Sequence, residues 1–374
     1  MYRDILALGN TASVMATISA YVPRMRVGCA PVPNSEVIQE NDRCFRIPGV
    51  NVSSISWVRF IREACAPNTN VHAELQYSPA CLRAGTQYGV HVHGTTDAEL
   101  LYPRTRLGAV LKSPFRVALE HANYVLSHPM LLRAVSQIRP DVLEFPSPVE
   151  TSQFSPGGDS VRMGDKICFL SPSRIDQWKG HAVIWEALRI MGHRERVQVF
   201  QSDWGWEPSY SRLRKGAPAS VEFIRVIPRK RIANYYRGAD VVIGQMQLGH
   251  LGLAELEAAA CGVPTTVFSK DAHSPFLPKH SDPVELAAVW DRIIEDHAFR
   301  QNYVSECRKY VMEHHNAERL ASRFQRIVDE SPKKGGRSLQ ARDIFPLELG
   351  TGLECVERIL GGPSGFVRAR LLGL

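Results

Sequence analysis

Hydrophobic and polar positions alternate in blocks along the second half of the chain. Short apolar runs are separated by helical segments of roughly 10–15 residues, a pattern typical of βαβ units and a parallel sheet. The runs predicted as strands are 167–170, 197–200, 221–224, 241–244 and 265–268. The segments predicted as helices are 180–191, a stretch ending near 214, 229–236 and 253–261.

One further helix is predicted from its start signals. Asp282 fits the N-cap, Pro283 the first helical position and Glu285 the first turn. Each of these residue types is favoured at its position.

The first half has a pattern of the same kind with less regular spacing. Its strand-like runs are 5–8, 26–29, 71–75, 90–93, 124–126 and 142–145. Turn-forming residues are frequent over 146–158, so a linker is predicted near 146–162. A chain of 374 residues is too long for one ordinary core. The predicted domains are therefore 1–150 and 151–330, followed by a C-terminal extension over 331–374.

Composition narrows the class of protein. Hydrophobic residues make up 44% of the chain and charged residues 22%, which is normal for a soluble globular protein. No apolar stretch approaches the roughly 18 residues that a membrane-spanning helix needs. The eight cysteines form no CxxC pair, which favours reduced thiols in a cytoplasmic protein over zinc fingers or a disulfide framework.

The net charge of +7 favours anionic partners: nucleotide phosphates, acidic lipid headgroups or nucleic acid. A basic surface with no specific partner is the alternative. Nucleic acid is disfavoured because zinc-finger spacing and RNA-recognition signatures are missing. Lys333, Lys334, Arg337 and Arg342 could touch the inner face of a membrane as a peripheral contact, although a solvated tail is the favoured interpretation.

The segment 252–264 carries the clearest chemical signal. It follows the apolar run 240–244, opens a helix after Gly249 and Gly252, and carries Glu257 before ending at Gly262. A helix start exposes unpaired N–H groups and suits an anion, and glycines allow a ligand to approach the backbone. A carboxylate further along the helix could accept hydrogen bonds from sugar hydroxyls. The pattern therefore fits a ligand with a diphosphate and a ribose.

Two cations follow the strand predicted at 167–170. Arg174 and Lys179 would lie at the carboxyl edge of the sheet, where they could hold a diphosphate and offset the charge that develops as it leaves. On spacing alone, such a pair is more often solvated surface.

His91 and His93 mark the end of another predicted strand. A histidine there could hydrogen-bond a sugar hydroxyl or a reacting group. A buried histidine or a metal ligand are the alternatives, and no third ligand is evident nearby. The turn 9–13 is a plausible ligand loop. The chain lacks the GxGxxG, GxxxxGK[ST] and GxSxG motifs, which disfavours NAD binding, P-loop nucleotide hydrolysis and serine hydrolysis.

These motifs resemble the retaining GT-B glycosyltransferases of family four, the glycosyl transferases group 1 type. Gly249 to Leu253 align with the first half of that family's core motif, and Glu257 to Pro264 closely resemble its second half. Ser173-Arg174-Ile175 with Lys179-Gly180 resembles its Gly-Arg-Leu and Lys-Gly elements, 145–156 its linker entry, and His93-Gly94-Thr95 its His-Gly motif. The resemblance spans 70–328 and is strongest over 168–315.

The resemblance implies an α/β protein with two Rossmann-like domains whose parallel sheets face a cleft. It also implies roles for individual residues. Arg174 and Lys179 would bind the donor diphosphate and act in catalysis, and Glu257 would bind the ribose. His93 would lie near the transferred sugar and the acceptor and would also act in catalysis. Further donor contacts would come from Val226 near the base and from the turn that carries His250, Leu251, Gly252 and Leu253.

One position departs from the family pattern. The family's first glutamate, which contacts the transferred sugar, falls on Gly249. His250 or Gln247 could take its place, whereas Glu255 is not positioned to do so.

The resemblance implies a metal-independent hexosyl-type glycosyltransferase without a cofactor. It would transfer a sugar from a nucleotide-diphosphate sugar, its co-substrate, to a carbohydrate, lipid-linked or small-molecule acceptor, with retention of configuration. A catalytically inactive sugar-nucleotide-binding protein of the same fold and a sugar-nucleotide epimerase are the alternatives.

Overall fold

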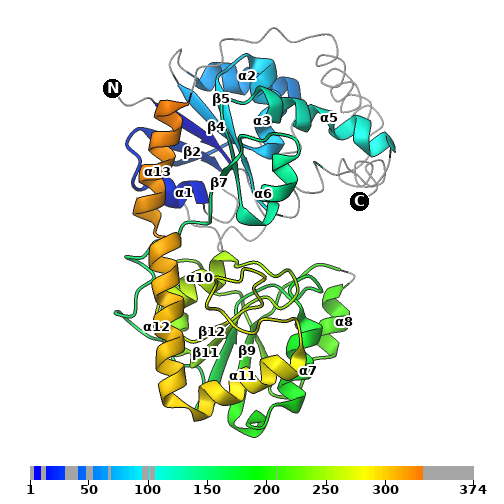
Figure 1. Cartoon of the computed structure of the whole chain (residues 1–374), viewed down its shortest axis with the longest axis vertical. Coiled ribbons are helices and arrows are strands. Elements are labelled where there is room, and N and C mark those ends of the chain that lie inside the picture. The colour runs from blue at the N-terminus through cyan, green and yellow to red at the C-terminus, as the bar shows by residue number, and fades with distance from the viewer. Residues whose placement is uncertain are drawn as a thin grey trace. The chain divides into compact units, whose positions relative to one another are not determined.

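The chain folds into two compact units. The computed structural model describes residues 4–9, 14–29, 41–47, 54–65, 69–94, 101, 106–207 and 209–331. Of these, the residues up to Pro146 and from Arg319 onward form the first unit, and Ser147–Glu318 form the second (Figure 1).

The first unit is built on a seven-stranded parallel sheet with the order β3-β2-β1-β4-β5-β6-β7. Its strands are β1 Ile5–Leu8, β2 Met25–Cys29, β3 Cys44–Arg46, β4 Asn70–Glu74, β5 Tyr88–Val92, β6 Val125–Ser127 and β7 Leu143–Glu144.

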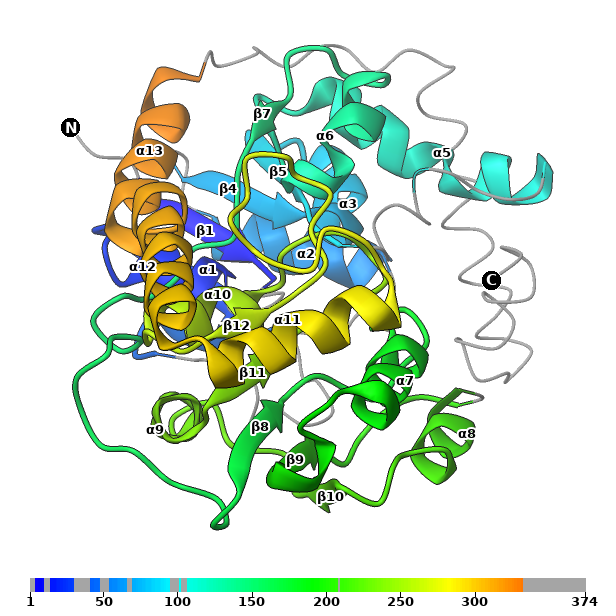
Figure 2. The same ribbon diagram turned by 60° about the horizontal axis from the view of Figure 1, so that its bottom comes forward.

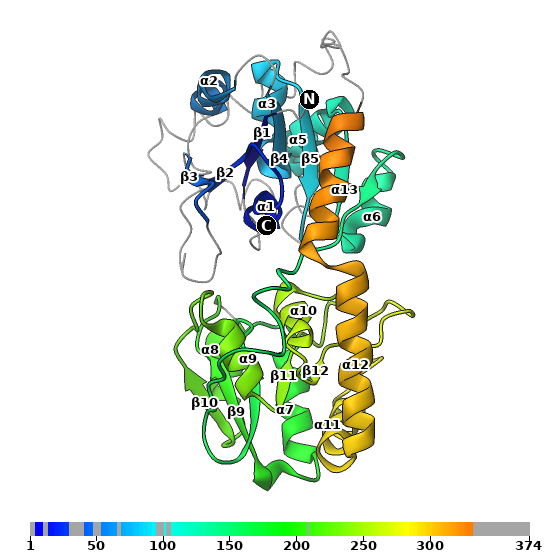
Figure 3. The same ribbon diagram turned by 90° about the vertical axis from the view of Figure 1, so that its left-hand side faces the viewer.

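Alternate residues of β1 face opposite sides of this sheet, as the pleat of a strand requires. Ile5 and Ala7 belong to one apolar cluster and Leu6 and Leu8 to another. The first cluster is shared with α1 (Val14–Ser19) and α13 (Ala317–Glu330), which lies along this unit in Figure 3. The second is shared with α2 Ser54–Ala64, α3 Ser78–Ala84, α5 Arg106–His121 and α6 Pro129–Ser136, and the short 3-10 turn η3 Leu75–Tyr77 precedes α3.

The second unit has a five-stranded parallel sheet with the order β10-β9-β8-β11-β12. Its strands are β8 Ile167–Ser171, β9 Val197–Ser202, β10 Val221–Ile224, β11 Val241–Ile243 and β12 Thr265–Thr266. Its helices, seen around the sheet in Figure 2, are α7 His181–Ile190, α8 Ser209–Lys215, α9 Ile232–Gly238, α10 Leu253–Ala260, α11 Pro283–Glu295 and α12 His297–His314, with the 3-10 turn η4 Arg194–Arg196.

One continuous core stabilises the second unit. The sheet contributes Phe169 and Val199, and α11 contributes Trp290, whose ring meets that of Phe169 at 5.4 Å between centroids. The indole nitrogen of Trp290 donates to Thr266 Oγ1 at 3.1 Å, so its polar group is satisfied inside the core.

Most predicted elements of the second half are present. The predicted start of α11 is confirmed, since the Asp282 side chain accepts from the Val284 N–H at 3.1 Å and Pro283 occupies the first turn. Helix α9 begins at Ile232 rather than at 229, because Arg231 N bonds to Pro228 O and closes a turn first. Strand β3 was not predicted, since its three residues carry no alternating pattern.

The chain passes from one unit to the other after Pro146 and again after Glu318, whereas the predicted domain limits are 150 and 330. The chain enters the second unit at Ser147, and residues 319–330 return to the first. The reason is the apolar face of α13, where Leu320, Phe324 and Val328 are buried in the first unit's core. The predicted extension from 332 onward and the predicted ligand turn at 10–13 lie outside the described residues.

The described cysteines are all free thiols. No helix within the described ranges has the length and apolar character needed to cross a membrane.

Candidate functional site at the carboxyl edge of the second sheet

The strand order of the second unit determines where its loops meet. β8 pairs with β9 on one side and with β11 on the other, so the connections that leave β8 and β11 diverge from neighbouring points on the sheet. Ligands of open parallel sheets bind outside the carboxyl ends of the strands at such a point. The loops 172–180 and 244–252, which carry most of the predicted site residues, both lie there.

These two loops are in direct contact. Met246 N donates to Lys179 O at 2.9 Å. Gly180 has a φ of +77°, and a Cβ at this position would lie 2.8 Å from the carbonyl carbon of Met246. Only glycine fits this conformation and this approach. The structure therefore brings the loop of Arg174 and Lys179 together with the turn that precedes α10.

Arg174 is held in a defined orientation. Its Nε donates to Asp176 Oδ2 at 2.9 Å, and its guanidinium carbon lies 4.2 Å from the ring centroid of Trp206. The side chain is 24% exposed. Among the described residues, its two terminal nitrogens have no hydrogen-bond partner, so they can bind an anion.

Asp176 stabilises the same loop through hydrogen bonds within it. Its Oδ1 accepts from Trp178 N at 2.8 Å, and its backbone is bonded to His181 Nδ1. The other nitrogen of His181 lies 3.1 Å from Gln201 Oε1. Burial lowers the pKa of His181 to about 4, so the ring is neutral at pH 7 and serves as a hydrogen-bonding spacer.

Lys179 lies half-buried at the end of this loop. Its ammonium group has no ion-pair or hydrogen-bond partner in the part of the chain that the structure describes. Lys179 and Arg174 therefore present two cations with uncommitted donors at one edge of the sheet, which is the charge pattern expected of a diphosphate site.

The turn before α10 is organised by Gln245, a residue that belongs to none of the sequence motifs described above. Its Nε2 donates to His250 O at 2.6 Å and to Phe268 O at 3.0 Å. Its Oε1 accepts from Gln247 N and Leu248 N. A buried polar side chain directly after an apolar strand is the signal that could have identified it.

The start of α10 already carries an acidic group of the chain. Gly252 caps the helix with extended backbone and without a side-chain hydrogen bond. The carboxylate of Glu255 lies beside it and accepts from Gln245 N at 2.9 Å, while its side chain is almost fully buried. This carboxylate is thus committed to the helix start. His250, Leu251 and Leu253 are half-buried around the same turn.

Glu257 is fully buried and paired with Arg229. Arg229 Nη1 donates to Glu257 Oε2 at 2.6 Å, and Arg229 Nη2 donates to Oε1. The Arg229 guanidinium also lies 5.0 Å from the ring centroid of Phe154. Burial raises the pKa of the Glu257 carboxyl, and Arg229 opposes that effect. In this conformation both carboxylate oxygens are enclosed with a cation of the chain, so a ribose hydroxyl would reach them only after a local change.

The ion pair also holds the segment that is predicted to bind the nucleotide base. Val226 precedes Arg229 in the connection between β10 and α9, so the ion pair anchors this connection to α10. Arg229 was not predicted, because its partner lies 28 residues away in the sequence.

The Gly249 position explains why a glutamate is disfavoured there. Gly249 has a φ of +76°, a conformation that side chains other than Asn and Asp rarely adopt. A Cβ would lie 2.6 Å from Lys270 Cγ. The stem of Lys270 therefore fills the space into which a side chain at 249 would project.

His93 belongs to a row of histidines in the first unit. The rings of His72, His91, His93 and His128 follow one another with centroids 5.8, 5.6 and 5.3 Å apart. Burial lowers the pKa of His72 to about 3 and of His93 to about 4, and holds that of His91 well below its usual value. These three rings are therefore neutral at pH 7, and His93 can act there only as a neutral hydrogen-bonding group. In the described residues, no group of His, Cys, Asp and Glu side chains is arranged to hold a metal ion.

Comparison with known proteins finds a family match in the second unit. The family model described as "Glycosyl transferases group 1" matches residues 159–310. The second unit is therefore similar to this family, in agreement with the resemblance inferred from its motifs. The match contains the loops after β8 and β11 and helix α10.

Two curated relatives carry the name D-inositol 3-phosphate glycosyltransferase. The one from Xylanimonas cellulosilytica is 26% identical over 185 residues, which are 45% of this chain and 44% of the relative. The one from Geodermatophilus obscurus is 28% identical over 174 residues, 39% of each chain. The matched regions thus span less than half the length of these relatives.

Solved structures match over most of the chain. Sucrose-phosphate synthase from Thermosynechococcus elongatus has a TM-score of 0.65 at 16% identity and covers 88% of this chain and 99% of its own. Anabaena HepE in complex with UDP and glucose has a TM-score of 0.67 at 14% identity and covers 88% and 100%. A glycosyltransferase from Rickettsia africae has a TM-score of 0.67 at 14% identity and covers 89% and 99%. These likenesses confirm the predicted fold class, GT-B with two Rossmann-like domains.

A first prediction concerns the backbone at Gly249. Gly249→Ala should lower the free energy of unfolding by about 1 kcal/mol, because a Cβ is strained at positive φ. Gly249→Asn should lose less, since asparagine tolerates this conformation. Urea unfolding measures both. Gly216→Ala is the control, because its Cβ would meet only ordinary contacts. Equal free energies of unfolding for the wild-type protein and Gly249→Ala would contradict a positive φ at this position.

A second prediction concerns the buried ion pair. Arg229→Met should lower the free energy of unfolding by about 3–5 kcal/mol, because it leaves a buried carboxylate without its cation. The double variant Arg229→Met/Glu257→Gln should recover much of that loss. Arg231→Met, at an exposed residue of the same connection, is the control. Additive losses in the double variant would show that the two side chains are not coupled.

A third prediction concerns acid sensitivity. The folded pKa of His72 lies below that of the unfolded chain, so the unfolded state binds the extra proton first and stability falls as pH falls below about 6.5. Each such histidine contributes a slope of up to about 1.4 kcal/mol per pH unit. His72→Phe should reduce the slope between pH 6 and pH 4.5 in urea titrations.

The exposed His273 provides the control for this prediction. His273→Phe makes the same substitution outside the row of buried histidines and shows what the substitution itself changes. His72→Phe also removes the 3.1 Å contact between Nδ1 and the Tyr124 hydroxyl. Loss of this contact lowers the free energy of unfolding equally at every pH, so it does not contribute to the expected change in slope. An unchanged slope in His72→Phe would contradict the burial of a neutral ring.

Proposed function

We propose that this protein is a glycosyltransferase that moves a sugar from a nucleotide-diphosphate sugar to an acceptor hydroxyl. The observation that carries the proposal is the pair of cations at the carboxyl edge of the second sheet. Arg174 and Lys179 keep donors uncommitted there, whereas the nearby carboxylates of Glu255 and Glu257 are engaged within the chain. The names of the relatives and the UDP in the HepE complex support the same ligand class.

The chemistry follows from where charge develops. When the bond between the anomeric carbon and the donor phosphate breaks, negative charge grows on the diphosphate. Cations already oriented toward that charge lower the barrier, because they need no reorganisation. Arg174 and Lys179 would stabilise the leaving diphosphate, and the donor phosphate itself would accept the acceptor's proton on the same face, with retention of configuration.

Apart from His93, the remaining residues would bind the donor and take no part in the reaction. The turn of His250, Leu251, Gly252 and Leu253 would contact the donor through its backbone. Val226 would lie near the base, and Glu257 would approach the ribose if Arg229 yields one of its two contacts. His93, in the first unit, would face the transferred sugar and the acceptor as a neutral ring.

Metal independence and a hexose donor belong to the same proposal. A chelator such as EDTA should leave turnover unchanged, because the two cations would take the part that a metal plays in other transferases. A hexosyl donor should give faster turnover than a pentosyl donor with the same nucleotide. The acceptor would be a carbohydrate, a lipid-linked sugar or a small molecule.

The first experiment finds the donor nucleotide. UDP, GDP, ADP and their sugars are compared by thermal shift, because a ligand of the folded state raises the melting temperature by mass action. Donor and acceptor pairs are then tested for turnover. Nucleotide binding without any turnover would favour an inactive sugar-nucleotide-binding protein, and product formed without an acceptor would favour an epimerase.

The fourth prediction tests the two cations. Arg174→Ala and Lys179→Ala should each lower kcat by about 10²–10³-fold, since each removes one electrostatic contact to the leaving group. Lys215→Ala, an exposed lysine at the end of α8, should leave kcat unchanged. Turnover near the wild-type rate in both site variants would overturn the proposal.

A further inference from the structure

Trp206 is an exposed tryptophan beside the proposed diphosphate site. It lies in the loop that follows β9, and 61% of its surface is exposed. Single exposed apolar residues are common on protein surfaces and need no special explanation. This one differs because its ring lies against the guanidinium of Arg174, at 4.2 Å from the ring centroid to the guanidinium carbon.

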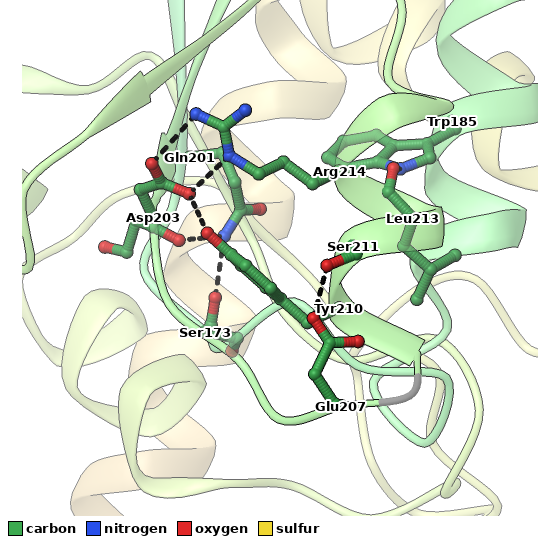
Figure 4. Close-up of polar contacts among 10 residues, drawn as sticks. Ser173, Trp185, Gln201, Asp203, Glu207, Tyr210, Ser211, Leu213 and Arg214 are labelled. Atoms are coloured by element: carbon green, nitrogen blue, oxygen red, sulfur yellow. Dashed lines mark hydrogen bonds and ion pairs between the residues drawn. The ribbon is translucent and has the colours of Figure 1, made fainter.

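The loop of Trp206 is held in place at both ends. At its start, Asp203 accepts from the Tyr210 hydroxyl at 2.7 Å and from Arg214 Nε and Nη2 at 2.9 and 3.0 Å (Figure 4). At its end, Tyr210 N donates to Trp206 O at 3.2 Å. The Arg214 guanidinium also lies over the Phe223 ring at 4.4 Å. These contacts hold the described residues on either side of Trp206.

The same loop is joined to the loop of Arg174. Ile175 N donates to Trp204 O at 2.8 Å, and Ile175 and Gly205 form a parallel bridge. Gly205 permits this approach, because a Cβ there would lie 2.4 Å from Ile175 O. Gln201 Nε2 donates to Ser173 O at 2.7 Å, a contact visible in Figure 4. The two backbone segments that carry the indole and the guanidinium are therefore held side by side.

The result is a guanidinium confined on two sides. Asp176 takes Nε, and Trp206 covers one face of the plane. An arginine side chain gives up substantial rotamer entropy when it is ordered by a ligand. The contacts with Asp176 and Trp206 order the Arg174 side chain before a ligand binds, and its terminal nitrogens remain available as hydrogen-bond donors.

We propose that Trp206 is a positioning residue of the donor site, which holds the guanidinium of Arg174 ready to bind the donor diphosphate. The proposal rests on the proposed function, in which Arg174 contacts that diphosphate. Trp206 acts through Arg174, so its contribution should depend on the phosphates of the ligand and not on the nucleoside.

The test measures dissociation constants by calorimetry. The ligands are whichever of UDP, GDP and ADP raises the melting temperature most, and the nucleoside that lacks its diphosphate. Trp206→Leu should weaken diphosphate binding about three- to tenfold, the range of a partly exposed cation–π contact. Nucleoside binding should stay unchanged. Trp206→Phe, which keeps an aromatic face, should restore most of the affinity.

A double-mutant cycle separates positioning from other roles. In the Arg174→Ala background, Trp206→Leu should cause no further loss of diphosphate affinity. Val284→Ala is the control, since Val284 is a 63% exposed apolar residue on α11, outside the loops of the site, and should leave diphosphate affinity unchanged. Melting temperatures of all variants show whether folding is intact.

The outcomes are distinct. The same loss in the presence and absence of Arg174, an equal loss for the nucleoside, or no loss in Trp206→Leu would overturn the positioning role while leaving the proposed function in place. If the wild-type protein binds none of the three nucleoside diphosphates, the proposed function fails and the role of Trp206 fails with it.

Discussion

Strand β8 pairs with β9 on one side and β11 on the other, and this constraint determines the position of every group discussed in the second unit. Because all strands of the sheet are parallel, the connections that leave them emerge at one edge. Gly180 then allows the loop after β8 to touch the turn after β11. Arg174, Lys179 and the start of α10 are neighbours for this reason, although up to 79 residues separate them in the sequence (253 − 174 = 79).

At this edge the acidic side chains have partners within the chain, whereas the basic side chains keep donors that a ligand could use. Both glutamates of α10 are buried and engaged within the chain: Glu255 accepts from the backbone of Gln245, and Glu257 holds Arg229. A buried carboxylate needs such partners, because burial without them is costly. The cations near the loop surface have donors left over. An anionic ligand would therefore complete the electrostatics of this edge, and the ordered Arg174 would pay little entropy to bind it.

The sequence predicts the parts of this arrangement that depend on local signals. The apolar run Ile167–Leu170 predicts β8, Asp282 and Pro283 predict the start of α11, and the cations after β8 follow from their position. Side chains that act through distant partners leave no such signal. From the sequence alone, Arg229 resembles a surface cation and Trp206 an ordinary loop residue. The structure shows that Arg229 pairs with Glu257 and that the Trp206 ring contacts Arg174. Likewise, α13 packs on the first unit through an apolar face whose partner the sequence does not name.

The decisive measurement is a crystal structure of the protein with a bound nucleoside diphosphate. In it, the phosphates should lie within hydrogen-bond distance of the Arg174 guanidinium and the Lys179 ammonium, at the carboxyl edge of β8 and β11. Arg174 should keep its contacts with Asp176 and Trp206 in the complex. Phosphates bound elsewhere, with both cations left in solvent, would contradict a diphosphate site at this edge.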